Sequence, residues 1–162
     1  MLDQLTKLVE EHAGTTIVQN SAVPNQHNSA AIKDVASQIF DGLQNQVKQG
    51  NLQEVMSLFQ GNQSSIASHP IVNQIINNVA GSLASKFGVS QQQAQSIASS
   101  LLPAVMNKFV TKTNNSSDND FDLQGMMQNF TGNSSFDVGS LLGGITTDKA
   151  KDALGGLGKL FG

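Results

Sequence analysis

The feature that most constrains this fold is an apolar-periodic stretch from His69 to Val110, because no other part of the chain has enough apolar surface to nucleate a core. Its first segment carries one wide stripe at helical spacing: Ile71, Val72, Ile75, Ile76, Val79, Ala80, Leu83, Ala84 and Phe87. Pro70 suits a first helical turn. Gly88 ends the segment, since glycine adopts the left-handed conformation freely.

A second helix follows, and Ser90 is placed to cap its first turn. Its apolar face comprises Ala94, Ile97, Ala98, Leu101, Leu102, Val105, Met106 and Phe109. Pro103 removes a backbone hydrogen bond to Ser99 and is expected to kink or split the helix. The two segments predict a central antiparallel helix pair joined by a tight glycine turn.

The turn at residues 84–97 also fits a helix-turn-helix motif, which would place the helix from Gln91 in a DNA major groove. The motif residues would be Ala84, Gly88, Val89, Ser90, Ala94 and Ile97. Residues 91–102 contain no Lys, however, and the chain contains no Arg. Phosphate contacts need positive charge. Nucleic acid is therefore a disfavoured partner, and a DNA-binding or regulatory protein remains the alternative function.

The remaining sequence also predicts helices. An amphipathic helix begins the chain and ends at Gly14, and another runs from Ala30 to Gly50. Residues 15–29 and 62–68 have no apolar period and are expected to be loops. The predicted fold is all-α, with one multihelical domain around the central pair.

A short segment is repeated, since residues 51–61 (NLQEVMSLFQG) align without a gap with residues 122–132 (DLQGMMQNFTG). Both begin with a capping residue, Asn51 or Asp122, and end in glycine. Residues 137–144 (DVGSLLGG) form a weaker third copy. A capped helix this short is not stable alone, so each copy must dock on the core of its own chain or on another copy of the protein.

These considerations divide the chain into a core at 1–110, a polar linker at 111–121, and short-helix repeats with a Gly-rich tail at 122–162. Interface candidates are the apolar residues beyond the linker: Leu123, Met126, Met127, Phe130, Leu154, Leu157, Leu160 and Phe161. The tail is expected to dock in a groove of a neighbouring subunit. Contact with a membrane surface ranks below this, because only Lys149, Lys151 and Lys159 could meet anionic lipid.

The repeated glycine-closed short helix, L-x-x-[VM]-M-x-x-F-x-G, followed by an FGVS…A…I…LP helix pair, resembles the bacterial DUF937 family, which includes the YidB-like proteins. The resemblance covers about residues 30–145. It implies a multihelical all-α fold. It implies no established activity and no catalytic residues.

No catalytic, cofactor or metal site is predicted. The chain has no Cys, and the three histidines (His12, His27 and His69) lack the close spacing of zinc ligands. Asp118, Asp120 and Asp122 lack the turn glycine and the bidentate Glu of a calcium loop. No serine lies in a Gly-x-Ser-x-Gly elbow. We therefore expect that the protein is not an enzyme.

The composition points to assembly instead. Charged residues make up 13% of the chain, about half the usual share, and Asn, Gln and Ser take their place. Such a surface offers little like-charge repulsion between copies. The first segment, MLDQLTKLVEEHAG, is not expected to be a secretory signal, and no apolar run approaches the roughly 20 residues needed to span a bilayer. We expect a cytoplasmic, non-enzymatic protein that assembles into homo-oligomers or filaments.

Overall fold

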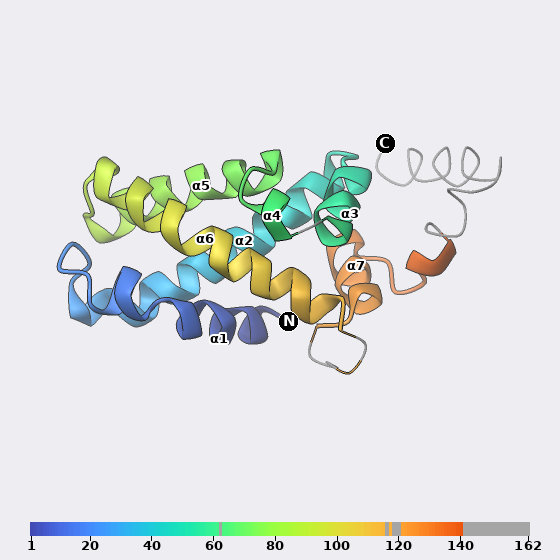
Figure 1. Cartoon of the computed structure of the whole chain (residues 1–162), viewed down its shortest axis with the longest axis horizontal. Coiled ribbons are helices and arrows are strands. Elements are labelled where there is room, and N and C mark those ends of the chain that lie inside the picture. The colour runs from blue at the N-terminus through green and yellow to red at the C-terminus, as the bar shows by residue number, and fades with distance from the viewer. Residues whose placement is uncertain (62, 116, 118–120, 141–162) are drawn as a thin grey trace.

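The structure, a computed structural model, describes residues 1–61, 63–115, 117 and 121–140, and within these ranges every regular element is a helix. The predicted all-α fold is confirmed. Four long helices form a bundle: α1 (Leu2–His12), α2 (Asn28–Lys48), α5 (Pro70–Phe87) and α6 (Gln91–Thr113) (Figure 1). They contact one another in a ring, because α2 packs against α1 and α5, and α6 packs against α5 and α1.

Short elements connect or follow the long helices. They are η1 (a π-helix, Gly14–Val18), η2 (a 3₁₀ helix, Asn25–His27), α3 (Leu52–Gln60), α4 (Gln63–Ile66) and α7 (Leu123–Thr131). The short helices α3 and α7 cover one end of the bundle, whereas η1 and η2 lie at the opposite end (Figure 1). The prediction that 15–29 and 62–68 are plain loops is therefore wrong. Ile17 and Ile66 are almost completely buried in these stretches. A helical turn lets the backbone satisfy its own hydrogen bonds while such a side chain is buried.

The central pair forms as predicted at its turn. Gly88 is left-handed, with φ of 69°, and the Ser90 hydroxyl accepts the Gln93 N–H at 3.3 Å. Of the two outcomes expected at Pro103, a kink or a split, the split does not occur, because α6 continues through the proline. Proline inside a helix costs about 3 kcal/mol. Burial of each large apolar side chain contributes about 1.5–3 kcal/mol, and α6 has several on both sides of the proline: Leu101, Leu102, Val105 and Met106.

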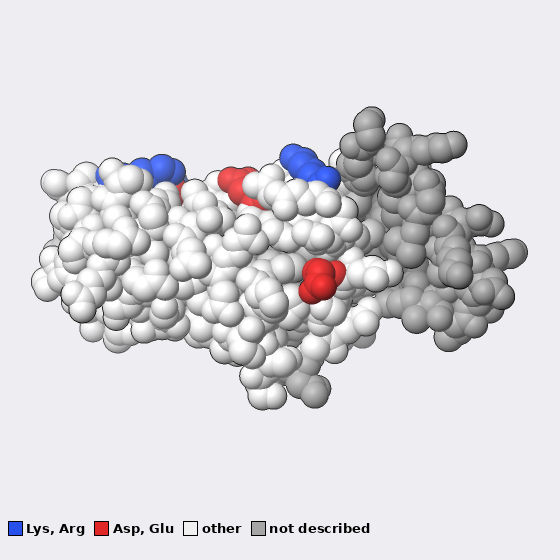
Figure 2. Space-filling view, turned by 90° about the horizontal axis from the view of Figure 1, so that it is seen from above, with Lys and Arg blue, Asp and Glu red and all other residues white. Residues whose placement is uncertain are grey.

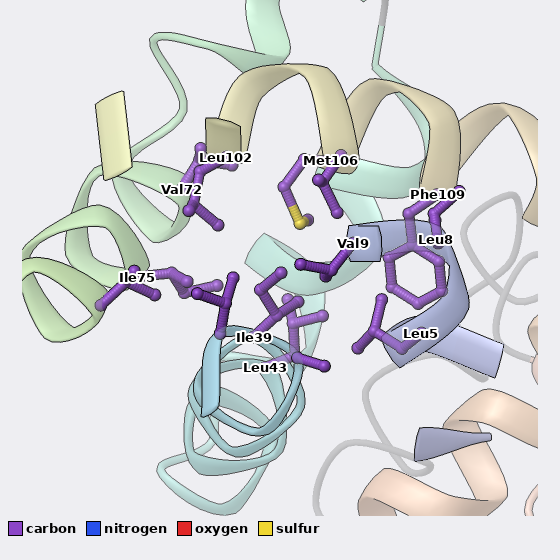
Figure 3. Packing of buried hydrophobic residues seen from close by; sticks show 14 of the residues in the cluster. Leu5, Leu8, Val9, Ile39, Leu43, Val72, Ile75, Leu102, Met106 and Phe109 are labelled. Atoms are coloured by element: carbon purple, nitrogen blue, oxygen red, sulfur yellow. The ribbon is translucent and has the colours of Figure 1, made fainter. Parts of the chain in front are cut away.

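One continuous core lies between the four long helices. All four supply side chains to it: Leu5, Leu8 and Val9 from α1, Ile39 and Leu43 from α2, Val72 and Ile75 from α5, and Leu102, Met106 and Phe109 from α6 (Figure 3). Phe109 also forms edge-to-face contacts with Phe59 of α3 and with Phe121, at centroid distances of 5.5 and 5.3 Å. This aromatic row extends the core to the end covered by the short helices.

The bundle consists of two equivalent halves, α1–α2–α3 and α5–α6–α7, each a long helix pair followed by a short helix. The repeat seen in the sequence is therefore part of a larger one. Buried residues occupy equivalent positions: Leu5 and Ile76, Leu8 and Val79, Val9 and Ala80, Ala31 and Ile97, Val35 and Leu101, Ile39 and Val105, Leu43 and Phe109, Met56 and Met127, Phe59 and Phe130. The identities differ except in the two pairs of the short helices, so the two halves share a burial pattern more than a sequence.

The short helices pack across the two halves, since α3 contacts α6 and α7 contacts α2. Phe130 of α7 meets Phe40 of α2 at a ring distance of 5.3 Å. The second copy of the short repeat forms α7, and α7 docks on α2 of its own chain. Residues 111–113, expected to begin the linker, instead form the last turn of α6. Phe121 at the other end of that segment is buried.

The two short helices are closed in different ways, although both end at the predicted glycine. Gly132 is left-handed with φ of 68°, whereas Gly61 is extended with φ of −70°. At the start of α7, Asp122 accepts the Gly125 N–H at 2.8 Å, as predicted. Asn51 makes no such capping bond. Its side chain donates to Gln46 at 2.8 Å instead, so the capping role expected of Asn51 is wrong.

We predict that Met127→Ala destabilises the protein by about 2–5 kcal/mol, because Met127 is completely buried between α7 and the bundle. Urea unfolding followed by circular dichroism measures this. Met127→Leu, which keeps the volume, is expected to cost less than about 1.5 kcal/mol. Gln53→Ala at an exposed position of α3 is the surface control. Wild-type stability in Met127→Ala would show that α7 does not dock on α2.

Candidate functional site

The outer surface of α5 and α6 is almost free of charge. Residues 70–107 include one charged residue, Lys86. Helical spacing places the apolar stripes of both helices inward and leaves amides and hydroxyls outward. We call the following exposed residues the neutral surface: Asn73, Gln74, Asn77, Asn78, Gln91, Gln92, Gln93, Ser96, Ser99 and Ser100. Figure 2, viewed from the α5 side, shows a mostly uncharged surface with a few scattered charged groups.

Apolar contacts do not define a binding surface on the described part of the chain. The large hydrophobic side chains exposed there are Leu2 and Val18, at 44% and 43%. They lie at opposite ends of the α1–η1 segment, and an interaction patch needs contiguous apolar area. A partner that binds the described residues must therefore be recognised mainly through polar contacts.

Lys86, the one charged residue between 70 and 107, is neutralised within the molecule. Its ammonium group contacts the Asp34 carboxylate of α2, which also accepts the Ser82 hydroxyl at 2.5 Å. Asp34 is 10% exposed and Lys86 is 55% exposed. Partly exposed pairs contribute about 0–1 kcal/mol, so this pair mainly fixes α2 against α5. The helix-turn-helix candidate at 84–97 thus has a single cation, which is already paired.

Ser57 and His69 form a serine–histidine pair that the sequence did not predict, with 3.2 Å between Oγ and Nε2. The directions of the hydrogen bonds oppose nucleophilic catalysis. His69 Nδ1 accepts the Ile71 N–H at 3.3 Å, so in the neutral ring the proton is on Nε2. Ser57 donates its own proton to the Glu54 carbonyl. The imidazole therefore donates to Ser57 and cannot accept its proton, as a general base must.

His69 has a structural role that its position before Pro70 did not reveal. Its ring caps the N-terminus of α5, a position usually taken by Ser, Thr, Asp or Asn. The other two histidines are also tied locally. His12 Nδ1 lies 3.0 Å from the Leu8 carbonyl, and the His27 ring packs 6.0 Å from the Phe87 ring. Among the described residues, no group of three or more His, Asp or Glu side chains is arranged to hold a metal.

Glutamine side chains fasten the last described segment to α7. Gln124 donates to the Phe136 carbonyl and accepts the Val138 N–H at 2.8 Å. Gln128 also donates to the Phe136 carbonyl, at 3.2 Å. Phe136 and Val138 are thereby buried against the core. These amides stabilise the fold and do not contribute to the neutral surface.

Asp137 begins the third short repeat, and residues 138–140 are helical as the capping prediction requires. The Ser140 hydroxyl donates to its carboxylate at 2.8 Å, and so does the Gly139 N–H at 2.9 Å. These bonds stabilise the charged form and lower the pKa of Asp137 below its ordinary value, with the Ser140 bond as the largest cause.

The candidate interface residues of the C-terminal region divide into two groups. Met126, Met127 and Phe130 are buried in the core of their own chain, and Leu123 is half-buried against it. Within this chain they pack against its own core, and their assignment to an interface between copies stays a prediction. Leu154, Leu157, Leu160 and Phe161 lie outside the described residues, as do Asp118 and Asp120 of the calcium-loop candidate.

The neutral surface itself was visible in the sequence only as a low overall charge. Counting charged residues helix by helix would have located it, since the depletion lies in the central hairpin. Within the described ranges, no helix combines the length and the apolar character needed to cross a bilayer.

Comparison with protein-family models, with curated proteins and with solved structures gave no match.

We predict that Ser57 is no more reactive than an ordinary exposed serine, because its neighbouring imidazole cannot accept its proton. A fluorophosphonate probe followed by peptide mass spectrometry measures the labelling rate. Ser96, which is exposed and has no histidine partner among the described contacts, is the internal reference. Fast labelling of Ser57 that disappears in His69→Ala would contradict the assignment.

We predict that Ser140→Ala raises the pKa of Asp137 toward its ordinary value, because it removes the largest cause of the shift. Carboxyl chemical shifts in an NMR pH titration measure this. Because the folded pKa is depressed, the two bonds stabilise the 138–140 turn above the unfolded pKa, and this is lost as the pH falls through the folded pKa. Ser134→Ala is the control. An equal pKa in Ser140→Ala and wild type would refute the assigned cause.

Proposed function

We propose that this protein is a non-enzymatic, self-assembling structural or interaction protein that forms homo-oligomers or filaments. The observation that carries the proposal is the neutral surface, where a single charged residue occurs between 70 and 107. Charged surfaces of like sign keep copies of a protein apart. A surface of amides and hydroxyls lacks that repulsion and can exchange hydrogen bonds with an identical surface.

The arrangement of polar side chains supports a non-enzymatic role. Ser57 and His69 are hydrogen-bonded in the wrong direction for nucleophilic attack. In the Asp34–Ser82–Lys86 cluster, the Ser82 hydroxyl and the Lys86 ammonium group both donate to the Asp34 carboxylate. Each cluster thus has a sufficient explanation in helix capping or helix packing. The proposal also takes the chain to be a cytoplasmic member of the bacterial DUF937 family, and these assignments rest on the sequence resemblance and composition alone.

The mass of the purified protein in solution tests the proposal. We expect gel filtration with light scattering to give a species well above the 17.1 kDa of one chain, with a mass that rises with concentration, and negative-stain images of that fraction to contain regular particles or filaments. Measurements at low and high salt serve as a control, because a contact between uncharged surfaces is weakly screened. A sharp monomer at all concentrations and salt levels would rule out self-assembly as the function.

A further inference from the structure

The two halves of the bundle provide an internal comparison of surface charge. The helices α1 and α2 contain eight charged residues, whereas the longer pair α5 and α6 contains three. Alignment of the buried positions pairs every charged residue of α1 and α2 with an uncharged one in the second half: Asp3 with Gln74, Lys7 with Asn78, Glu10 with Gly81, Glu11 with Ser82, Lys33 with Ser99, Asp34 with Ser100, Asp41 with Asn107, and Lys48 with Asn114.

This difference does not come from the needs of folding. Both halves place the same kind of apolar stripe in the same core, and both end in an equivalent short helix. The first half shows that this architecture tolerates an ordinary number of surface charges. Exposed positions such as Asn78 and Ser100 could hold charges as readily as Lys7 holds one. The low charge of α5 and α6 is therefore not a requirement of this architecture.

We propose that the neutral surface of α5 and α6 binds the same surface of a second copy of this chain. This rests on the proposed function and assigns the contact to residues 70–107 rather than to the C-terminal tail. A surface that binds a charged partner is expected to carry charges complementary to that partner, and the neutral surface carries none. Asn and Gln amides each carry donors and an acceptor, so a surface rich in them is complementary to itself, as a two-fold symmetric contact requires.

The test uses two variants of the full chain that place charges of one sign on the neutral surface. In Asn78→Lys/Ser100→Lys, the proposed contact brings the new ammonium groups of the two copies onto the same interface. In Asn78→Asp/Ser100→Asp, it brings carboxylates there. Both positions are exposed, and no hydrogen bond of either side chain is seen in the structure, so both variants are expected to fold. Each should weaken self-association about tenfold or more, because like charges are brought together at the contact.

The matched control is Asn45→Lys/Gln49→Lys, which makes the same change in net charge at exposed positions at the end of α2. It should associate like wild type. The decisive measurement is the mass, by light scattering, of an equimolar mixture of the lysine and aspartate variants. If the neutral surface contacts itself, opposite charges meet across it and the mixture regains association. If it contacts a different surface, mixing restores nothing.

Several outcomes would overturn the inference while leaving assembly intact. They are wild-type association in both charge variants, no recovery on mixing, or loss of association on deletion of residues 146–162 with no effect of the surface charges. The last result would show that residues 146–162, and not the neutral surface, make the contact between copies. A wild-type protein that remains monomeric would overturn both this inference and the proposed function. Circular dichroism of every variant confirms that it is folded as wild type.

Discussion

The structure depends on how its two longest helices, α2 and α6, each pack against two helices of the other half of the bundle. Because α2 contacts α5 and α7, and α6 contacts α1 and α3, neither half covers its own apolar surface alone. The core is continuous from Leu5 to Phe130, and the aromatic row around Phe109 carries it into the short helices. These contacts between the two halves fix the positions of the other helices, and with them the position of the neutral surface.

Much of the fold could be predicted from the sequence because its signals are local. The apolar stripes of α2, α5 and α6, the Gly88 turn and the Ser90 and Asp122 caps depend on residues three or four positions apart. The errors arose where tertiary packing decides. Burial of Ile17 and Ile66 turned expected loops into helical turns. Packing on both sides of Pro103 kept α6 in one piece, which no local rule predicts.

The candidate site was less predictable than the fold. The short repeat at 51–61 and 122–132 could be found in the sequence because five positions are identical. The long helix pairs, α1–α2 and α5–α6, share only a pattern of buried positions, and that pattern is seen only in the structure. The low charge of residues 70–107 could be counted in the sequence, whereas its contrast with equivalent positions of the other half, such as Lys7 against Asn78, needed the structure. The roles of His69 and Ser57 depend on hydrogen-bond directions across α3 and α5, which spacing along the chain cannot give.

The docking of α7 on α2 affects how the chain is made. Phe40 lies in the first third of the sequence and packs against Phe130, so it stays uncovered until the ribosome has synthesised nearly the whole described chain. Loop closure over that separation adds an entropic cost before the contact is formed. The surface of α2 that α7 covers is therefore exposed on the nascent chain until α7 has been synthesised, and α7 docks late in the formation of the bundle.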